Sequence, residues 1–434
     1  MTVEAQAQSQ PQPRHAVRMS SVVSWVLYDL ANTIFSLNII SLYFSLWVVN
    51  IMGGTELLYA IANGIATGLM LIASPVLGAL SDQAPRRLPF LTVSTIVCVS
   101  ATLLLGAGGL AVSLVFFAVA NIFYQAGLIF YDSLLPEVST EENRGRVGGL
   151  GVGIGYFGSV IGIAVAFLLL PSTPQSEDYI TVFRATALLF LLFSIPAFVF
   201  IRERPRRVGR FGADAVRRSF LEIRQTARRA GRYPGLWRFL VGRVFYTDAA
   251  NTLILFMGVY VQNELGFSSD NTQLLLLVGI ITAIIGGLVW GVVVDRLGPK
   301  RTLNMVLILW VLVLGLAVAI PVLNLPPALF WIDAALSGIA LGGTWSSDRP
   351  LMLRLSPPRY LGQFYGLYGM VGRFAAIVGP LMWGLIVNVL DLGRPTAIGA
   401  LAVLVLISVV ILRPVSDTPR RWSSDELAPH AAEA

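Results

Sequence analysis

The sequence predicts an all-α membrane protein in which twelve transmembrane helices form two pseudo-symmetric six-helix bundles. Three observations support this fold class. Hydrophobic residues make up 56% of the 434 residues and charged residues only 13%, with a mean hydropathy of +0.74, whereas soluble domains are roughly half apolar and a quarter charged. The apolar residues are gathered into runs long enough to cross a bilayer. Similar residue patterns also recur about half a chain apart.

Each predicted helix rests on the requirement that a membrane-spanning helix contains about 20 mostly apolar residues. Applying that window gives twelve spans near residues 22–48, 57–80, 90–108, 111–135, 147–170, 180–201, 238–261, 272–294, 302–322, 327–353, 361–390 and 395–412. The runs are continuously apolar and do not alternate with polar residues, which excludes an outer-membrane barrel.

The orientation of the spans follows from the positions of the basic residues. Placing the N-terminus in the cytoplasm assigns 26 of the 31 basic residues to cytoplasmic ends and leaves only Arg184 and Arg394 on the opposite face. Cytoplasmic loops carry the excess of arginine and lysine in membrane proteins. We therefore expect a multi-pass protein of the cytoplasmic membrane with both termini in the cytoplasm.

The polar segments divide the chain. Residues 1–20 lack the compact apolar core of a signal peptide, and they are expected to form a disordered cytoplasmic tail, as are residues 414–434. The N-terminal half covers residues 21–201 and the C-terminal half residues 238–413. Between them, residues 202–237 carry apolar side chains at helical spacing among arginines: Ala213, Val216, Phe220, Ile223 and Ala227. This pattern predicts a basic amphipathic helix on the anionic inner leaflet. A regulatory or partner-binding arm is the alternative.

The composition excludes several kinds of chemistry. The only histidines, His15 and His430, lie in the polar tails, and the single cysteine, Cys98, lies in an apolar run. A Cys/His metal site, a disulfide framework and a catalytic triad with His or Cys are thus excluded. Lys300 is the only lysine and follows Pro299, so no phosphate-binding loop ends in Gly-Lys-Ser/Thr. We expect no enzyme activity, no cofactor and no bound metal.

The net charge of +7 does not indicate a nucleic-acid partner. Residues 202–238 hold twelve arginines against only three acidic residues, a surplus larger than that of the whole chain. The charge therefore reports how the chain lies in the membrane. The expected partners are membrane lipid and a small-molecule substrate.

An internal repeat joins the two halves. Residues 29–33 (Asp-Leu-Ala-Asn-Thr) recur as residues 248–252 (Asp-Ala-Ala-Asn-Thr), and residues 78–82 (Gly-Ala-Leu-Ser-Asp) correspond to residues 291–295 (Gly-Val-Val-Val-Asp). Asp132 corresponds in the same way to Asp348, 216 positions later. Two halves of the same orientation are the parallel-repeat arrangement of some secondary transporters.

These residues carry a family resemblance. The Gly-x-x-x-Asp loops after spans two and eight, each followed by basic residues, resemble the signature loop of the major facilitator superfamily. More narrowly, residues 25–32 (Trp-Val-Leu-Tyr-Asp-Leu-Ala-Asn), 130–136 (Phe-Tyr-Asp-Ser-Leu-Leu-Pro) and 248–251 resemble the vacuole-effluxer branch, whose fungal member exports amino acids from the vacuole. The chain departs from that pattern at Leu30, where an aromatic residue is usual, and at Asp132, where asparagine is frequent.

Ionisable side chains inside spans are costly, so they are candidates for function. Asp29 and Asp248 lie at similar depths in spans one and seven, and polar residues follow each of them on the same face: Asn32, Thr33, Asn251 and Thr252. The resemblance implies that spans one, four, seven and ten line a central cavity, with these residues on or near its walls. We expect one carboxylate to bind a polar or cationic group and the other to take up a proton. The alternative is that each Asp is neutralised by a basic neighbour or caps a kinked helix.

Arg373 is a deep cation in span eleven. Its guanidinium could clamp a substrate carboxylate or phosphate, or it could pair with Asp29 or Asp248 as a structural bridge. Arg243 and Asp248 lie five residues apart on different faces of one helix and are poor partners for each other. Asp333 lies nearer the outer end of span ten, where an external gate and a solvated position are both open.

A second group of charges is expected to form a cytoplasmic gate. The resemblance implies that the loops after spans two and eight close the inner side through charge pairs. The residues assigned to this gate are Asp82, Arg86, Asp132, Asp295, Lys300, Arg301 and Asp348.

The function that these residues indicate is secondary active transport of a small polar metabolite, such as an amino acid, by a monomer that alternates access and couples transport to protons. Two alternatives stay open: a hydrophobic drug/proton exchanger, and a membrane assembly factor or sensor that transports nothing.

Overall fold

The computed structural model describes residues 17–54, 56–171, 174–205, 233, 235–418 and 422. The amphipathic helix expected within residues 202–237 lies mostly outside this part of the chain. The greater part of both predicted tails also lies outside it.

The N-terminal half is a helical bundle. Its helices are α1 (Met19–Phe35), which continues through η1 (Ser36–Leu42), α2 (Tyr43–Leu46) and η2 (Trp47–Ile51), then α3 (Glu56–Asp82), α4 (Leu88–Leu103), α5 (Gly109–Ser133), the short α6 (Leu135–Val138), α7 (Arg144–Leu169) and α8 (Ser176–Phe200). The six spans predicted in this half each correspond to one long helix or helix run. Pro75 and Pro196 lie inside α3 and α8, where neighbouring helices can satisfy the backbone groups that proline frees.

The C-terminal half repeats this order. It consists of α10 (Leu236–Leu265), α11 (Ser269–Leu297), α12 (Pro299–Val322), α13 (Leu329–Leu355), the short η3 (Pro358–Tyr360), α14 (Leu361–Gly384) with η4 (Leu385–Val389), and α15 (Arg394–Leu412). Among the described residues, ten helices are long and apolar enough to cross a membrane, α4 is a shorter apolar helix, and α13, with 27 residues and a more polar composition, is the twelfth helix of the predicted set. The predicted all-α fold of twelve membrane helices is confirmed.

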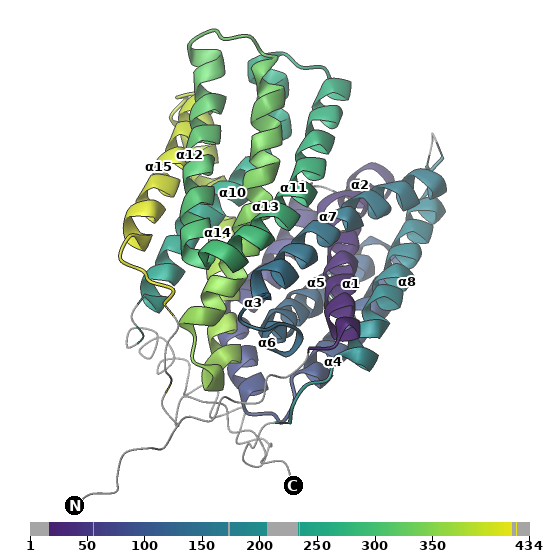
Figure 1. Ribbon diagram of the computed structural model, residues 1–434. Coiled ribbons are helices and arrows are strands. Elements are labelled where there is room, and N and C mark those ends of the chain that lie inside the picture. Colours follow the sequence, from purple (N-terminus) through teal and green to yellow (C-terminus); the bar gives the residue numbers. More distant parts are fainter. Residues whose placement is uncertain are drawn as a thin grey trace, which may run out of the picture.

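The two halves stand side by side (Figure 1). Between the halves, α3 packs against α14, and α7 packs against α11 and α13. We call the end that contains the last residues of α3 and α11 and the first residues of α7 and α14 the basic end, because most described arginines lie there. The other end is called the opposite end.

Glycines on two faces of α7 allow close packing on both sides. On one face, a Cβ atom at Gly149 would collide with the Gly287 carbonyl oxygen of α11, and one at Gly145 would lie 2.6 Å from the Gly291 carbonyl oxygen. On the other face, a Cβ atom at Gly151 would lie 2.6 Å from the ring of Trp25 in α1. Small residues let membrane helices approach closely. Helix α7 therefore packs closely against α1 of its own half and against α11 of the other half.

The contact between α3 and α14 is concentrated near the basic end. A Cβ atom at Gly78 would collide with the Gly362 carbonyl oxygen, and one at Gly366 would lie 2.5 Å from the Ser74 carbonyl oxygen. Farther along α3, nothing lies within 4 Å of a Cβ atom placed at Gly64 or Gly68. The halves are therefore in tight backbone contact at the basic end and not along the whole length of α3.

Candidate functional site

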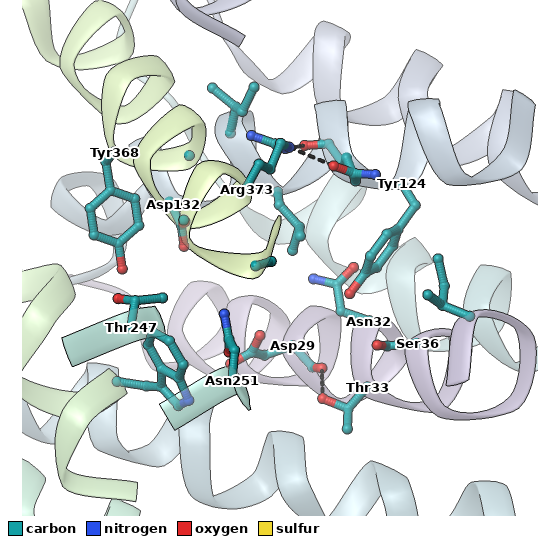
Figure 2. A pocket seen from close by; sticks show the side chains of 18 of the residues that line it. Asp29, Asn32, Thr33, Ser36, Tyr124, Asp132, Thr247, Asn251, Tyr368 and Arg373 are labelled. Carbon is teal, nitrogen blue, oxygen red and sulfur yellow. Dashed lines mark hydrogen bonds between the residues drawn. The ribbon is translucent and has the colours of Figure 1, made fainter. Parts of the chain in front are cut away.

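A cavity of about 570 Å³ lies between the two halves. Its wall includes five of the residues predicted from the sequence: Asp29, Asn32, Thr33, Asn251 and Arg373. Figure 2 shows the α1 residues along one side and Arg373 approaching from α14. Further polar side chains complete the wall: Ser36, Asn63, Thr67, Asn121, Tyr124, Gln125, Asp132, Tyr156, Arg243, Thr247, Trp345, Arg349, Tyr365 and Tyr368.

Arg349 of α13 joins the two halves through two ion pairs. Its Nη1 lies 3.2 Å from Asp29 Oδ2, and its Nε lies 3.1 Å from Asp132 Oδ1. Both carboxylates belong to the N-terminal half, and the three side chains are 10–15% exposed. One guanidinium therefore serves two carboxylates across the interface between the halves. The sequence analysis assigned no partner to Arg349.

This arrangement differs from the gate role predicted for Asp132. The carboxylate lies in the cavity wall with Asp29, whereas the loops of the basic end were its expected neighbours. Asp132 is also not followed by a loop. Only one residue separates the end of α5 at Ser133 from the start of α6 at Leu135.

Asp348 also lies away from the predicted gate. Its Oδ2 is 3.0 Å from Arg243 Nε, and it accepts a hydrogen bond of 3.1 Å from the Tyr368 hydroxyl. The Arg243 guanidinium stacks 3.6 Å above the centre of the Tyr368 ring. Asp348 is seven residues from the end of α13 at Leu355, which places it about 10 Å from that end at about 1.5 Å per residue. It therefore pairs within the C-terminal half.

Stacked aromatic rings fix the surroundings of Asp29. The ring centres of Trp25 and Tyr131 are 4.5 Å apart and the rings nearly parallel, and the ring centre of Tyr28 lies 5.2 Å from that of Tyr131. Trp25 Nε1 donates a 3.2 Å hydrogen bond to the Tyr131 carbonyl oxygen. Aromatic pairs contribute about 0.5–1.5 kcal/mol each beyond their burial. These contacts hold α1 and α5 together, so that the carboxylates of Asp29 and Asp132 meet at Arg349.

The partners of Arg373 that the structure describes are all neutral. Its Nη1 donates to Ser74 Oγ at 2.7 Å and its Nη2 to the Gln125 carbonyl oxygen at 2.9 Å, while its Nε donates to Gln125 Oε1. In the described part of the chain it forms no ion pair, although it is only 9% exposed. The bridge to Asp29 or Asp248, one of the two alternatives considered from the sequence, is therefore not formed. Arg373 is a buried cation in the cavity wall that spans the two halves through α14, α3 and α5.

A series of amides continues from Arg373 along the N-terminal wall. Gln125 Nε2 donates to Asn121 Oδ1 at 2.9 Å, and Asn121 Nδ2 donates to Asn63 Oδ1 at 2.8 Å. On α1, Asn32 Nδ2 is buried and has no hydrogen-bond partner among the described residues. This wall therefore offers hydrogen-bond donors and acceptors to a polar ligand.

Asp248 and Thr252 do not line the cavity, although they were expected on or near its walls. They are 2% and 0% exposed, and a Cβ atom at Gly379 of α14 would collide with both side chains. Their neighbours Thr247 and Asn251 line the cavity instead. Successive residues point about 100° apart around a helix of 3.6 residues per turn, so α10 presents Asp248 to α14.

At the basic end, two aspartates bind the helix N-termini of the other half. Asp82, at the end of α3, accepts hydrogen bonds from the backbone N–H groups of Gly362 and Gln363 at 2.9 and 2.8 Å. Asp295, at the end of α11, accepts them from Gly145 and Arg146 at 2.6 and 3.1 Å. A helix N-terminus carries partial positive charge and unsatisfied N–H groups, so each carboxylate stabilises the contact between the halves.

The cationic partners of these aspartates differ from those predicted. Asp82 pairs with Arg87 at 2.5 Å, whereas Arg86 is exposed. Asp295 pairs with Arg146 at 2.7 Å. Arg301 is exposed, and the Lys300 ammonium donates to Asn304.

Two further acids, which the sequence analysis did not find, cap helices inside each half. Glu203 accepts hydrogen bonds from the N–H groups of Arg87 and Leu88 at the start of α4, at 2.5 and 2.8 Å. Asp417 accepts one from the N–H group of Lys300 at the start of α12, at 2.9 Å. The two acids are 214 positions apart, so they belong to the repeat.

Neutralising the inter-half caps is expected to open the basic end. In the Asp82→Asn, Asp295→Asn double variant, each charged hydrogen bond lost is worth about 1.5–3 kcal/mol, and about 1.4 kcal/mol already changes a population ratio tenfold. Spin labels at Arg86→Cys and Arg359→Cys, both exposed positions on opposite halves, should gain a population at longer separation in pulsed electron resonance. Cys98 is buried.

The matched control is Asp417→Asn, since the described partners of Asp417, Lys300 and Arg354, lie in its own half. This variant should leave the distance between the labels unchanged. An unchanged distance in the double variant would show that the two caps do not hold the halves together.

The two six-helix halves have the fold of major facilitator superfamily transporters. Residues 48–421 match the family model described as "Vacuole effluxer Atg22 like". The chain therefore belongs to the vacuole effluxer Atg22-like family, and the prediction of a transporter in place of an enzyme is confirmed.

Known proteins agree with this assignment. The chain is 28% identical over 422 residues to the uncharacterised MFS-type transporter YxiO of Bacillus subtilis, and the match covers 93% of this chain and 95% of that protein. It is 26% identical over 285 residues to autophagy-related protein 22-1 of Aspergillus niger, covering 60% of this chain and 45% of that protein. The chain thus spans about half the length of this fungal relative.

Solved structures show the same fold at low sequence identity. A bacterial homologue of the iron transporter ferroportin in an outward-facing state superposes with a TM-score of 0.71 at 17% identity, covering 92% of this chain and 99% of that one. The fucose:proton symporter FucP of E. coli gives a TM-score of 0.71 at 12% identity, covering 92% and 98%.

Proposed function

We propose that this protein is a secondary transporter that moves a small zwitterionic metabolite, such as an amino acid, through the central cavity by alternating access. The observation that carries the proposal is the distribution of charge in the cavity wall. Arg373 has no carboxylate partner among the described residues, and Asp29 and Asp132 share the single guanidinium of Arg349. The wall therefore has one surplus cation and one surplus anion at separate places.

A zwitterion complements this arrangement. Its carboxylate can receive hydrogen bonds from the planar fork of Arg373, and its ammonium group can bind the Asp29 and Asp132 pair. Complementary charges favour one ligand class over others, because an unmatched buried charge is costly. The volume of about 570 Å³ lies within the roughly 300–1,000 Å³ common for small-molecule sites.

Proton coupling is proposed for the same cluster. Arg349 of the C-terminal half binds two carboxylates of the N-terminal half, so protonation of one carboxylate leaves a single charge pair between the halves. That change weakens the contact that the halves must break when they move. Asp29 is proposed as the main proton acceptor, because it also lies beside the cavity residues Thr33 and Asn32.

The basic end is proposed to face the cytoplasm. In this orientation the protein lies in the cell membrane with both termini in the cytoplasm and residues 202–237 on the anionic inner leaflet. In this orientation the caps at Asp82 and Asp295 close the cytoplasmic side. Each chain contains a complete cavity, and the monomer is the proposed transporting unit.

The hydrophobic-drug alternative fits the cavity less well. Besides its charges, the wall holds several carboxamides, including Asn63, Asn121 and Gln125. Drug export would require the desolvation of these groups without compensating hydrogen bonds.

The proposal is tested in proteoliposomes by counterflow of radiolabelled amino acids, sugars and decarboxylated amines. We expect exchange of at least one amino acid. The corresponding decarboxylated amine should not be exchanged. Asp29→Asn, which removes the surplus anion, should exchange the amino acid only at higher concentration and should lose accumulation driven by a pH gradient, while Asp391→Asn, an exposed residue, should keep both. Exchange of amines or sugars alone would contradict the zwitterion assignment, and full accumulation by Asp29→Asn would contradict coupling at this residue.

A further inference from the structure

Asp333 is a buried acid that the transport cavity does not use. It lies in the second turn of α13, is 0% exposed, and is absent from the cavity wall. Neither of its carboxyl oxygens has a hydrogen-bond partner among the described residues, and it takes part in none of their ion pairs. The hydroxyl of Ser337, one helical turn farther on, is also without a partner. Asp333 therefore does not occupy the solvated position that was one of the two alternatives from the sequence.

Among the residues that the structure describes, none offers an unpaired cation to Asp333. Phe330, three residues earlier on the same helix, packs against the ring of Tyr260 in α10, with 6.0 Å between ring centres. The Tyr260 hydroxyl donates its hydrogen bond to the Ala317 carbonyl oxygen of α12 at 2.7 Å. Tyr260 itself interacts with Glu264 of α10 and with Asp333, and Glu264 already pairs with Arg394 at 3.0 Å.

The other helices packed against α13 keep their described charges far from Asp333. Asp295 and Arg296 of α11 and Lys300 and Arg301 of α12 lie at the basic end, as do Arg144 and Arg146 at the start of α7. On α13 itself, Asp348 and Arg349 begin fifteen residues later, which is about 22 Å along the helix at about 1.5 Å per residue. Arg373 of α14 is engaged by Ser74 and Gln125.

An ionised carboxylate has no means of stabilisation at this place. Burying an unpaired charge costs far more than burying a neutral polar group, and such groups become neutral instead. A neutral acid needs to lose only the hydration of its hydroxyl and carbonyl. We propose that Asp333 carries a proton in this conformation and forms a proton-binding site in the C-terminal half, separate from the central cavity.

The site has a defined place in the fold. Asp333 lies near the opposite end, beside the packing of α10, α12 and α13, so its proton can exchange with water only when these helices separate locally. This is a second proton site beside the Asp29 and Asp132 cluster, which has Arg349 as its cation. It does not depend on the identity of the substrate.

The test is infrared spectroscopy of the purified full-length protein at neutral pH. The difference spectrum between the natural protein and Asp333→Asn should show the loss of one carbonyl band of a protonated carboxylic acid. The matched control Asp391→Asn, an exposed acid, should show no such loss. The absence of a band difference for Asp333→Asn would overturn the proposal.

A second measurement needs no variant. Dicyclohexylcarbodiimide is an apolar reagent that attacks protonated carboxyl groups, so mass spectrometry of the treated natural protein should find an adduct on the peptide that contains Asp333. Prior opening of the fold by denaturant at alkaline pH should abolish that adduct. If Asp333 stays unmodified in the folded protein and the infrared difference spectrum also lacks the carbonyl band of a protonated acid, Asp333 is ionised and the proposal fails. Neither measurement uses transport, so failure here is distinct from failure of the proposed function.

Discussion

Replacement of Arg349 by glutamine is expected to cause the largest loss of stability of any single cavity substitution. It removes the cation that Asp29 and Asp132 share at 3.2 and 3.1 Å and leaves two carboxylates facing each other in a largely buried place. Removing one partner of a buried ion pair costs about 3–5 kcal/mol. We expect Arg349→Gln to lower the melting temperature of the purified protein strongly and to abolish transport.

The charge explanation has a specific rescue. In the triple variant Arg349→Gln, Asp29→Asn, Asp132→Asn the three side chains are neutral amides, so folding should recover while transport stays absent. Arg354→Gln is the matched control, because Arg354 forms a longer and more exposed pair with Asp417 at 3.7 Å, and such pairs contribute about 0–1 kcal/mol. Equal melting temperatures for Arg349→Gln and Arg354→Gln would show that the shared pair is not important for folding.

Replacement of Arg373 by glutamine is expected to have the largest effect on substrate binding at preserved stability. Glutamine can still donate to Ser74 or Gln125, the neutral partners of Arg373, so the halves should stay in contact. A charged hydrogen bond to a substrate carboxylate is worth about 1.5–3 kcal/mol, which corresponds to about a 10- to 150-fold loss of apparent affinity. Counterflow at graded substrate concentration measures this change.

Conservative and distant variants separate the role of the charge from that of the shape. Arg373→Lys keeps the charge but loses the planar fork, and it should lie between the natural protein and Arg373→Gln. Arg184→Gln, at an exposed arginine of α8, should leave the affinity unchanged. An unaltered affinity in Arg373→Gln would remove this residue from substrate binding and leave it a link between α14, α3 and α5.

Much of the fold could be predicted from the sequence, because the membrane imposes a length and a composition on each span. The repeat of residues 29–33 and 78–82 in the second half identified the halves and the aspartates that close the basic end. Asp82 and Asp295 indeed bind the opposite half. Their cations could not be assigned, because Arg86 and Arg87 are adjacent and only the turn after α3 decides which of them points inward.

The cavity was harder to predict, because its walls depend on how each helix is rotated. Asp29 and Asp248 occupy equivalent places in the repeat, yet α10 turns Asp248 toward Gly379 and presents Thr247 and Asn251 to the cavity. Arg349 was missed because its partners lie on helices of the other half, far away in the sequence. Its adjacency to Asp348 inside a predicted span was a usable signal, since two opposite charges at that depth each require a partner.

The two glycine faces of α7 limit how this transporter can change its substrate. A side chain added at Gly151 or Gly155 would come within 3.3 Å of the Asp29 carboxylate, and one added at Gly149 would force α11 away. Substitutions on α7 therefore disturb charge pairing and closure together. New substrate preferences, whether they arise in evolution or by engineering, are expected to come from Asn63 of α3 and Asn121 of α5, whose hydrogen bonds described above stay within the N-terminal half.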